Sequence, residues 1–344
     1  MIKSEVSASE AGLIYISDLN LGITRKLKNN VFHYCNSNGK KINDSKILSR
    51  IKSLGIPPAY RDVWICPEEN GHIQAIGYDI KGRKQYRYHP KWRSFRSMMN
   101  HKKMIEFGLV LPEIRSKVLL DLAGEGLKKE KILASIVRLI DITLIRVGND
   151  EYARENDSYG VTTLRKHHIK LLSEISFEIE FKGKSHKFHH IIVRDKRVTR
   201  IIIEALHVPG YELFKYLDSD DRLHKVDSDD VNNYIRSISG GDFTAKDFRT
   251  WWGTVFTLMA LQKVQVDFDR PLKVKCELTK VLKFVSDQLG NTPSVCRKFY
   301  IYPGLIDAYL EGELSKIIQE FSLDKSYPKL SKEEQLAFWF FKRV

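Results

Sequence analysis

Two arginines have positions that suit the stabilisation of negative charge in a phosphoryl-transfer reaction. Arg146 lies near the end of a long apolar segment, and Arg249 lies in the short segment KDFRT. A guanidinium can hold two non-bridging phosphate oxygens at once and does not lose its charge. Each arginine also has a structural explanation, since a cation offsets the dipole at a helix C-terminus, and Arg249 has Asp247 and two tryptophans as neighbours. Taken singly, each pattern favours the structural explanation.

A lysine, an amide and a tyrosine extend this set. Lys184 lies at the predicted tip of a hairpin, where an ammonium could donate a proton to a leaving oxygen, although most lysines in turns are simply solvated. Tyr300 ends a short basic segment that begins at Asn291, and a phenol can serve as a covalent nucleophile. The chain has 15 tyrosines, so most of them must serve packing instead.

Other routes to phosphate chemistry lack their usual motifs. The sequence has no Gly-x-x-x-x-Gly-Lys-Ser/Thr loop and no His, Asp or Glu cluster with metal-ligand spacing. The four cysteines are far apart and form no Cys-x-x-Cys pair, which predicts neither a zinc site nor a disulfide framework. We therefore expect no metal ion and no cofactor.

The elements that must position these residues change character along the chain. Between residues 12 and 90, short apolar runs alternate with turn residues, which predicts mainly strands. The apolar runs are 13–16, 63–65 and 73–76, and the turns include 57–58, 70–71 and 81–82.

From Trp92 onward the apolar residues follow a helical period. The broad apolar face from Ile132 to Ile145 predicts a helix that ends at Gly148, and residues 92–107 suit a connecting helix. The strictly alternating run 177–181 predicts a hairpin that turns through 182–184 and returns at 191–193. Further helix starts are indicated by Ser228, by Thr244 with Asp247, by Thr292-Pro293, and by Ser331 with Glu334.

These patterns predict an α+β protein with two domains. We expect a strand-rich N-terminal domain over residues 1–95 and a larger, mainly helical domain with a β-hairpin over residues 96–344.

The charge balance favours a polyanionic partner. Lys and Arg outnumber Asp and Glu by 57 to 43, which gives a net charge of +14. Nucleic acid is the partner that such a surplus favours, although a merely basic protein would share it. The chain begins with polar residues and has no apolar stretch long enough to span a bilayer, so we expect a cytoplasmic protein without membrane contact.

The joint order of the candidate residues is more informative than any one of them. Arg146, Lys184, Arg249, Asn291 and Tyr300 follow one another in an order that resembles the type IB DNA topoisomerases of the poxvirus-like and bacterial branch. The supporting stretches are 145–152, 155–156, 159–164, 181–184, 246–250 and 292–294, and in the N-terminal part 56–65, 70–75 and 82–89.

The resemblance implies both a fold and a reaction. The fold would be a strand-rich clamp domain followed by the catalytic fold shared by tyrosine recombinases and type IB topoisomerases. Tyr300 would attack a phosphate of duplex DNA, Arg146 and Arg249 would bind the transition state, and Lys184 would protonate the leaving 5′ oxygen. The cut strand would swivel and be resealed by a monomer without ATP or metal.

Two parts of the resemblance need comment. The family often has histidine at the position of Asn291, and an amide can donate a hydrogen bond to a phosphate oxygen but cannot supply charge or move protons. In the N-terminal domain, five residues of the 82–89 segment are expected to contact DNA. They are Arg83, Lys84, Gln85, Tyr86 and Tyr88, and an exposed basic hairpin is the other interpretation.

Two other functions remain open from the sequence. A tyrosine recombinase or integrase would use a related set of residues, but it would more often begin with a helical domain. A DNA-binding architectural protein could keep the fold without the catalysis.

Overall fold

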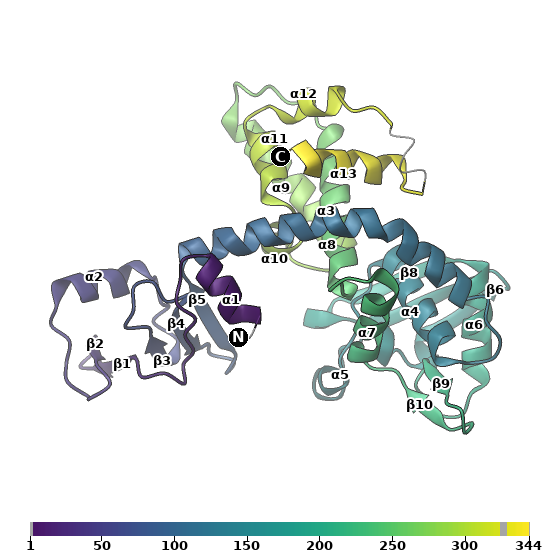
Figure 1. Cartoon of the computed structure of the whole chain (residues 1–344), viewed down its shortest axis with the longest axis horizontal. Helices are drawn as coiled ribbons and strands as arrows, with labels where there is room; N and C mark the ends of the chain where they lie inside the picture. Colours follow the sequence, from purple (N-terminus) through teal and green to yellow (C-terminus); the bar gives the residue numbers. More distant parts are fainter. Residues whose placement is uncertain (1–2, 324–328, 344) are drawn as a thin grey trace. The chain divides into compact units, whose positions relative to one another are not determined.

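The computed structural model describes residues 3–323 and 329–343 of the chain (Figure 1). It divides into two compact units, Met1–Asn100 and His101–Val344, which we describe separately. The division falls inside helix α3 (Pro90–Asp121), and the predicted boundary after residue 95 lies in the same helix.

The N-terminal unit is built around a five-stranded antiparallel sheet, as the alternating apolar runs predicted. Its strand order is β2-β1-β3-β4-β5. Ile23, Ile65 and Ala75 form its core together with Ile51 of a packed helix. The predicted strand at residues 13–16 is wrong, because only Ile14 makes an isolated bridge there. The elements are α1 (Lys3–Glu10), β1 (Ile23–Lys28), β2 (Val31–Cys35), α2 (Ser45–Ser53), β3 (Arg61–Ile65), β4 (Ile73–Tyr78) and β5 (Lys84–Tyr88).

The second unit is mainly helical, and helix α8 packs against α4, α7, α9, α11 and α13 near its centre. Phe107, Phe248 and Trp251 are fully buried there. The helices are α3 (Pro90–Asp121), α4 (Lys129–Thr143), α5 (Asp150–Asn156), α6 (Lys196–His207), α7 (Ser228–Ser239), α8 (Ala245–Gln262), α9 (Pro271–Gln288), α10 (Pro293–Phe299), α11 (Pro303–Leu310), α12 (Leu314–Gln319) and α13 (Lys332–Arg343).

A three-stranded antiparallel sheet of order β6-β7-β8 completes this unit. It contains the predicted hairpin, in which Phe177, Ile179 and Phe181 face the core. Of the two residues between them, Glu180 is exposed and Glu178 is largely buried. The strands are β6 (Ile169–Ser173), β7 (Ser176–Lys182) and β8 (Phe188–Arg194), and a separate two-stranded ribbon consists of β9 (Lys215–Leu217) and β10 (Leu223–Lys225).

Two predicted helix boundaries are wrong, each for a local reason. Helix α4 ends at Thr143, because Leu144 takes the left-handed conformation with φ 57° and thereby closes the helix before Gly148. Helix α7 is capped by Asp227 rather than Ser228, because the Asp227 carboxylate accepts from two backbone amides of the first turn.

The other predicted helix starts are confirmed. Asp247 accepts from the backbone amide of Thr244 at 2.8 Å. Ser331 and Glu334 exchange both bonds of a capping box. Thr292 caps α10, with proline at its first position.

A buried ion network joins four helices of this unit. Arg115 of α3 donates to both oxygens of Asp141 in α4 and to both oxygens of Glu334 in α13. Trp251 and Trp252 of α8 donate their indole N–H groups to the same two carboxylates, at 3.1 and 3.2 Å. These two hydrogen-bonded carboxylates raise the pKa of Arg115 above its usual value, against the opposing effect of burial.

We expect Arg115→Ala to destabilise the helical unit strongly. Two buried carboxylates would lose their cation, which costs about 3–5 kcal/mol in comparable cases. Lys117→Ala is the matched control, since it removes an exposed pair with Asp121 worth about 0.5 kcal/mol. Urea unfolding followed by far-UV circular dichroism measures both, and equal losses for the two variants would contradict the assignment.

Candidate functional site

Arg249 is held between the C-terminal ends of two helices. It projects from α8 and is only 4% exposed. Its two terminal nitrogens donate to the carbonyl oxygens of Leu144, which caps α4, and of Leu289, which caps α9. Helix C-termini carry partial negative charge, so this position favours a buried cation. Burial lowers the pKa of Arg249 below its usual value.

Arg146 lies beside Arg249, in the segment that follows the left-handed end of α4. Its guanidinium donates to the carbonyl oxygen of Gly290 at 3.1 Å and to the side-chain oxygen of Asn291. Burial, together with the positive charge of Arg249, lowers the pKa of Arg146 to about 10. Arg146 therefore remains charged at neutral pH.

Tyr300 follows the last residue of α10, next to the two arginines. The Arg249 guanidinium lies 5.2 Å from the centre of the Tyr300 ring, and the charges of both arginines act on the phenol. Gly253 of α8 makes this approach possible, because a Cβ atom at that position would lie 2.4 Å from the Tyr300 carbonyl oxygen.

The two arginines have no carboxylate partner among the residues that the structure describes. Their hydrogen-bond acceptors are carbonyl and amide oxygens, and Arg249 also interacts with the Tyr300 side chain. Two further buried donors in the site, Arg249 Nε and Asn291 Nδ2, lack a conventional acceptor, although the Asn291 amide contacts the weakly accepting Cys296 thiol. Cations without an acidic partner, together with unused donors, favour the binding of an anion.

Lys184 is not brought to this site. It is exposed in the short turn between β7 and β8, where Ser185 and His186 have left-handed φ values of 63° and 56°. Lys187, at the other end of the turn, donates to the backbone carbonyl of Asn291. The turn is therefore attached to the site through Lys187, while the Lys184 side chain is exposed.

His189 belongs to the site, although the sequence analysis missed it. Its ring stacks on Phe181 at 4.8 Å between centroids, and a Cβ atom on either Gly183 or Gly290 would lie 2.6 Å from it. Burial and the nearby cations, Arg146 first, lower the pKa of His189 to about 4. The neutral His189 ring thus packs between Gly183, which precedes Lys184, and Gly290, which precedes Asn291. The alternation of the predicted hairpin places His189 on the inward face, and this was the sequence signal that could have identified it.

The basic residues predicted to contact DNA in the N-terminal unit are paired with acids. Arg83 forms an ion pair with Asp79 at 2.7 Å, and Lys84 forms one with Asp18 at 2.5 Å. Gln85 donates to the same Asp79 carboxylate at 3.2 Å. A phosphate would have to compete with these carboxylates.

The two tyrosines of the same strand present an aromatic surface. Tyr86 and Tyr88 stack with centroids 5.8 Å apart and are 43% and 36% exposed. Burial raises the pKa of Tyr88 above its usual value, so it remains neutral. The pair offers flat rings and two hydroxyl groups at the surface.

One group of side chains that could hold a metal ion is formed by the fold. Glu178, Glu180 and His190 come together across two strands, although no spacing along the sequence indicates it. No helix among the described residues is long and apolar enough to cross a membrane.

Comparison with known proteins identifies the class. Residues 89–302 match the family described as eukaryotic DNA topoisomerase I, catalytic core, and residues 31–79 match the bacterial DNA topoisomerase IB, N-terminal domain. The chain is 30% identical to DNA topoisomerase 1B of Acanthamoeba polyphaga mimivirus, over 84% of this chain and 87% of that protein.

More distant relatives agree. DNA topoisomerase 1 of rabbit fibroma virus (strain Kasza) is 25% identical, over 80% of this chain and 86% of that protein. DNA topoisomerase 1B of Vaccinia virus (strain Copenhagen) is 21% identical, over 77% of this chain and 81% of that protein. The chain belongs to the type IB DNA topoisomerase family, as the order of its candidate residues predicted.

We expect Gly253→Ala to impair the reaction without removing any functional group. The new methyl group would meet the Tyr300 backbone, which cannot move aside as a flexible side chain can. A displacement of the phenol by about 1 Å can lower the rate by about 100-fold. Single-turnover DNA cleavage measures the effect.

The control for this variant is Lys246→Ala, an exposed change in the first turn of the same helix. It should cleave at the wild-type rate. A Gly253→Ala protein that keeps the wild-type rate would show that the close approach of α8 to Tyr300 is not needed.

Proposed function

We propose that this chain relaxes supercoiled duplex DNA by transient cleavage of one strand through Tyr300. The observation that carries the proposal is the pair of arginines beside the phenol, of which Arg249 is buried and Arg146 is partly buried. Their partners among the described residues include oxygen dipoles but no carboxylate. A phosphodiester brings the negative charge that this site lacks. The charge grows in the transition state, where fixed donors stabilise it most.

The reaction exchanges one phosphoester bond for another. The Tyr300 oxygen attacks phosphorus and loses its proton, the bond from phosphorus to the 5′ oxygen breaks, and a 3′-phosphotyrosyl link forms. Arg146 and Arg249 bind the non-bridging oxygens, and the free Asn291 N–H group adds a neutral donor. Because the bond is exchanged rather than hydrolysed, the strand can swivel and be resealed without ATP.

Lys184 is the proposed proton donor to the leaving 5′ oxygen. It is exposed in the turn between β7 and β8, so the turn has to carry it toward the site for the reaction. Lys187 and His189 keep the two ends of that turn close to Asn291 and Gly290. His189 is thus proposed as a positioning residue for the turn.

The N-terminal unit is proposed to contact duplex DNA through strand β5. Tyr86 and Tyr88 supply exposed hydroxyl groups, and Arg83, Lys84 and Gln85 supply donors once phosphates compete with Asp18 and Asp79. Binding should weaken steeply with salt, by a log–log slope of about −0.9 for each phosphate neutralised. We propose that a monomer suffices.

A tyrosine recombinase would use similar chemistry, but the five-stranded N-terminal sheet disfavours it, because recombinases more often begin with a helical domain. An inert DNA-binding protein would not need buried arginines without counter-ions. Relaxation of a supercoiled plasmid without paired specific sites separates these functions.

We expect Tyr300→Phe to abolish the covalent adduct with DNA. The wild-type chain, mixed with duplex DNA in EDTA and denatured, should retain a DNA strand that resists detergent, because the phosphotyrosyl bond is covalent. Tyr302→Phe is the matched control, since Tyr302 lies two positions away and stacks on His101. Persistence of the adduct in Tyr300→Phe, or its loss in Tyr302→Phe, would contradict the proposal.

We expect Lys184→Ala to slow cleavage by about 100- to 10,000-fold, the range for loss of a general acid. A substrate with sulfur in place of the 5′ bridging oxygen should restore the rate, because a thiolate leaves without a proton. Single-turnover cleavage of both substrates is the measurement. Lys182→Ala, which removes a neighbouring exposed lysine, should not distinguish the substrates. Failure of the sulfur substrate to rescue Lys184→Ala would remove the proton-donor role.

A further inference from the structure

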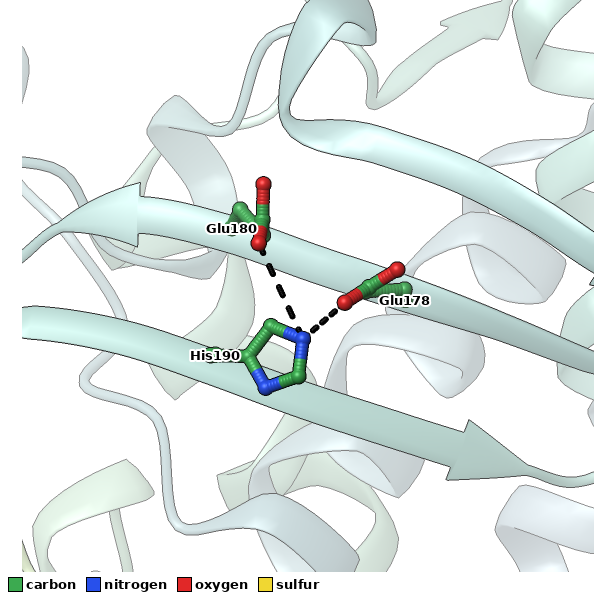
Figure 2. Close-up of side chains that lie close together, drawn as sticks. All are labelled: Glu178, Glu180 and His190. Carbon is green, nitrogen blue, oxygen red and sulfur yellow. Dashed lines mark hydrogen bonds and ion pairs between the residues drawn. The ribbon is translucent and has the colours of Figure 1, made fainter.

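The outer face of the β6-β7-β8 sheet carries a cluster of side chains that are ligands for metal ions. Glu178 and Glu180 are two positions apart on β7, so both face away from the core. His190 of β8 lies directly opposite Glu180 in the strand register. Figure 2 shows the His190 ring with one nitrogen turned toward both carboxylates.

The geometry is close to that of a three-ligand site. The His190 Nε2 atom lies 3.7 Å from Glu180 Oε1 and contacts Glu178 Oε1, and the three ligand atoms are all within 4.8 Å of one another. Zinc bonds of about 2.0–2.2 Å in a tetrahedron place neighbouring ligand atoms about 3.3 Å apart. Small side-chain rotations within the fixed strand register are enough to reach that spacing.

A further residue orients the most buried ligand. Glu178 is 8% exposed, and its second oxygen, Oε2, lies 3.5 Å from the Lys170 ammonium of β6. Oε1 is thereby left facing His190. Metal-binding carboxylates are commonly held by such an outer hydrogen bond or ion pair, which fixes the orientation of the ligand.

The charge of the cluster also favours a cation. Two carboxylates that share one face of a strand repel each other. A protonated His190 would offset part of that repulsion as a simple ion pair. A divalent ion offsets more of it and binds the neutral imidazole, which is the form of histidine that ligates metals.

We propose that Glu178, Glu180 and His190 bind a divalent transition-metal ion such as Zn²⁺, with water in the remaining position. One nitrogen and two carboxylate oxygens suit zinc better than Mg²⁺ or Ca²⁺, which prefer oxygen alone. The ion joins β7 to β8 at the Glu180–His190 pair, which is the third residue pair from the turn that carries Lys184. A restrained turn delivers Lys184 more slowly, so the bound ion slows DNA cleavage; this consequence, unlike the binding, rests on the proposed function.

Isothermal titration with ZnCl₂ tests the binding. The full chain is used with Cys276→Ser in every protein, because the exposed Cys276 thiol could bind zinc by itself. We expect one ion per chain, with affinity reduced about tenfold or more in His190→Ala and in Glu180→Gln. The matched control is His224→Ala, which removes an exposed histidine that pairs with a single carboxylate, Asp218. It should bind zinc as well as the parent protein.

Several outcomes would overturn the proposal. They are an absence of zinc binding, equal binding by His190→Ala and the parent, and equal losses in His190→Ala and His224→Ala. Melting temperatures without zinc should be alike, because the substituted side chains of Glu180, His190 and His224 are about half exposed. Cleavage with and without zinc tests the consequence: zinc should slow the parent but not His190→Ala. Tight zinc binding without any effect on cleavage would reject only the link to Lys184, and the proposed function would still stand.

Discussion

The packing of two guanidinium groups side by side, that of Arg249 buried and that of Arg146 partly buried, is the constraint on which this structure depends, since no acid among the described residues pairs with either. Each charge taken out of water costs several kcal/mol unless it is compensated, and the positive charge of Arg249 adds to the effect of burial on Arg146. The compensation comes from backbone dipoles. Arg249 donates hydrogen bonds to the carbonyl oxygens of Leu144 and Leu289 at two helix ends, and Arg146 donates one to the carbonyl oxygen of Gly290. Dipoles hold the cations in place without neutralising them, so an anion can still bind.

Much of the surrounding fold serves this arrangement. The left-handed residue Leu144 ends α4 early and turns its carbonyl toward Arg249. The ion network around Arg115 ties α3, α4 and α13 to the tryptophans of α8, the helix that carries Arg249. Gly253, one turn further along α8, lets the Tyr300 backbone come close. Asp141 and Glu334 thus hold helices together, while the site itself is left positive.

The sequence predicted the elements well where local chemistry decides them. The alternation of 177–181 gave the hairpin, and the Ser331–Glu334 and Thr244–Asp247 pairs gave two helix starts. It missed the end of α4, because Leu144 adopts a left-handed conformation that is unusual for a leucine. The five candidate residues were found by their order along the chain, and no local pattern indicated that Arg146 and Arg249 would share a site.

Features made by contacts between distant segments were beyond the sequence. His189 was one of 11 histidines until the fold placed its ring against Gly183 and Gly290. The group of Glu178, Glu180 and His190 depends on strand register, which spacing along the chain does not reveal. Lys184 is the opposite case. The order of residues along the chain indicates it as a candidate, but the structure leaves its side chain exposed.

The most direct test of the account is single-turnover DNA cleavage by Arg249→Ala and Arg249→Lys, with duplex affinity measured in parallel. If the arginine acts on transition-state charge, Arg249→Ala should lose about 100- to 1,000-fold in cleavage rate while its Kd for DNA stays nearly constant. Arg249→Lys should recover only part of the rate, because it keeps the charge but loses the two-pronged contact. Equal losses of rate and affinity in folded protein, or full activity of Arg249→Ala, would contradict the claim that the buried arginines form the phosphate clamp.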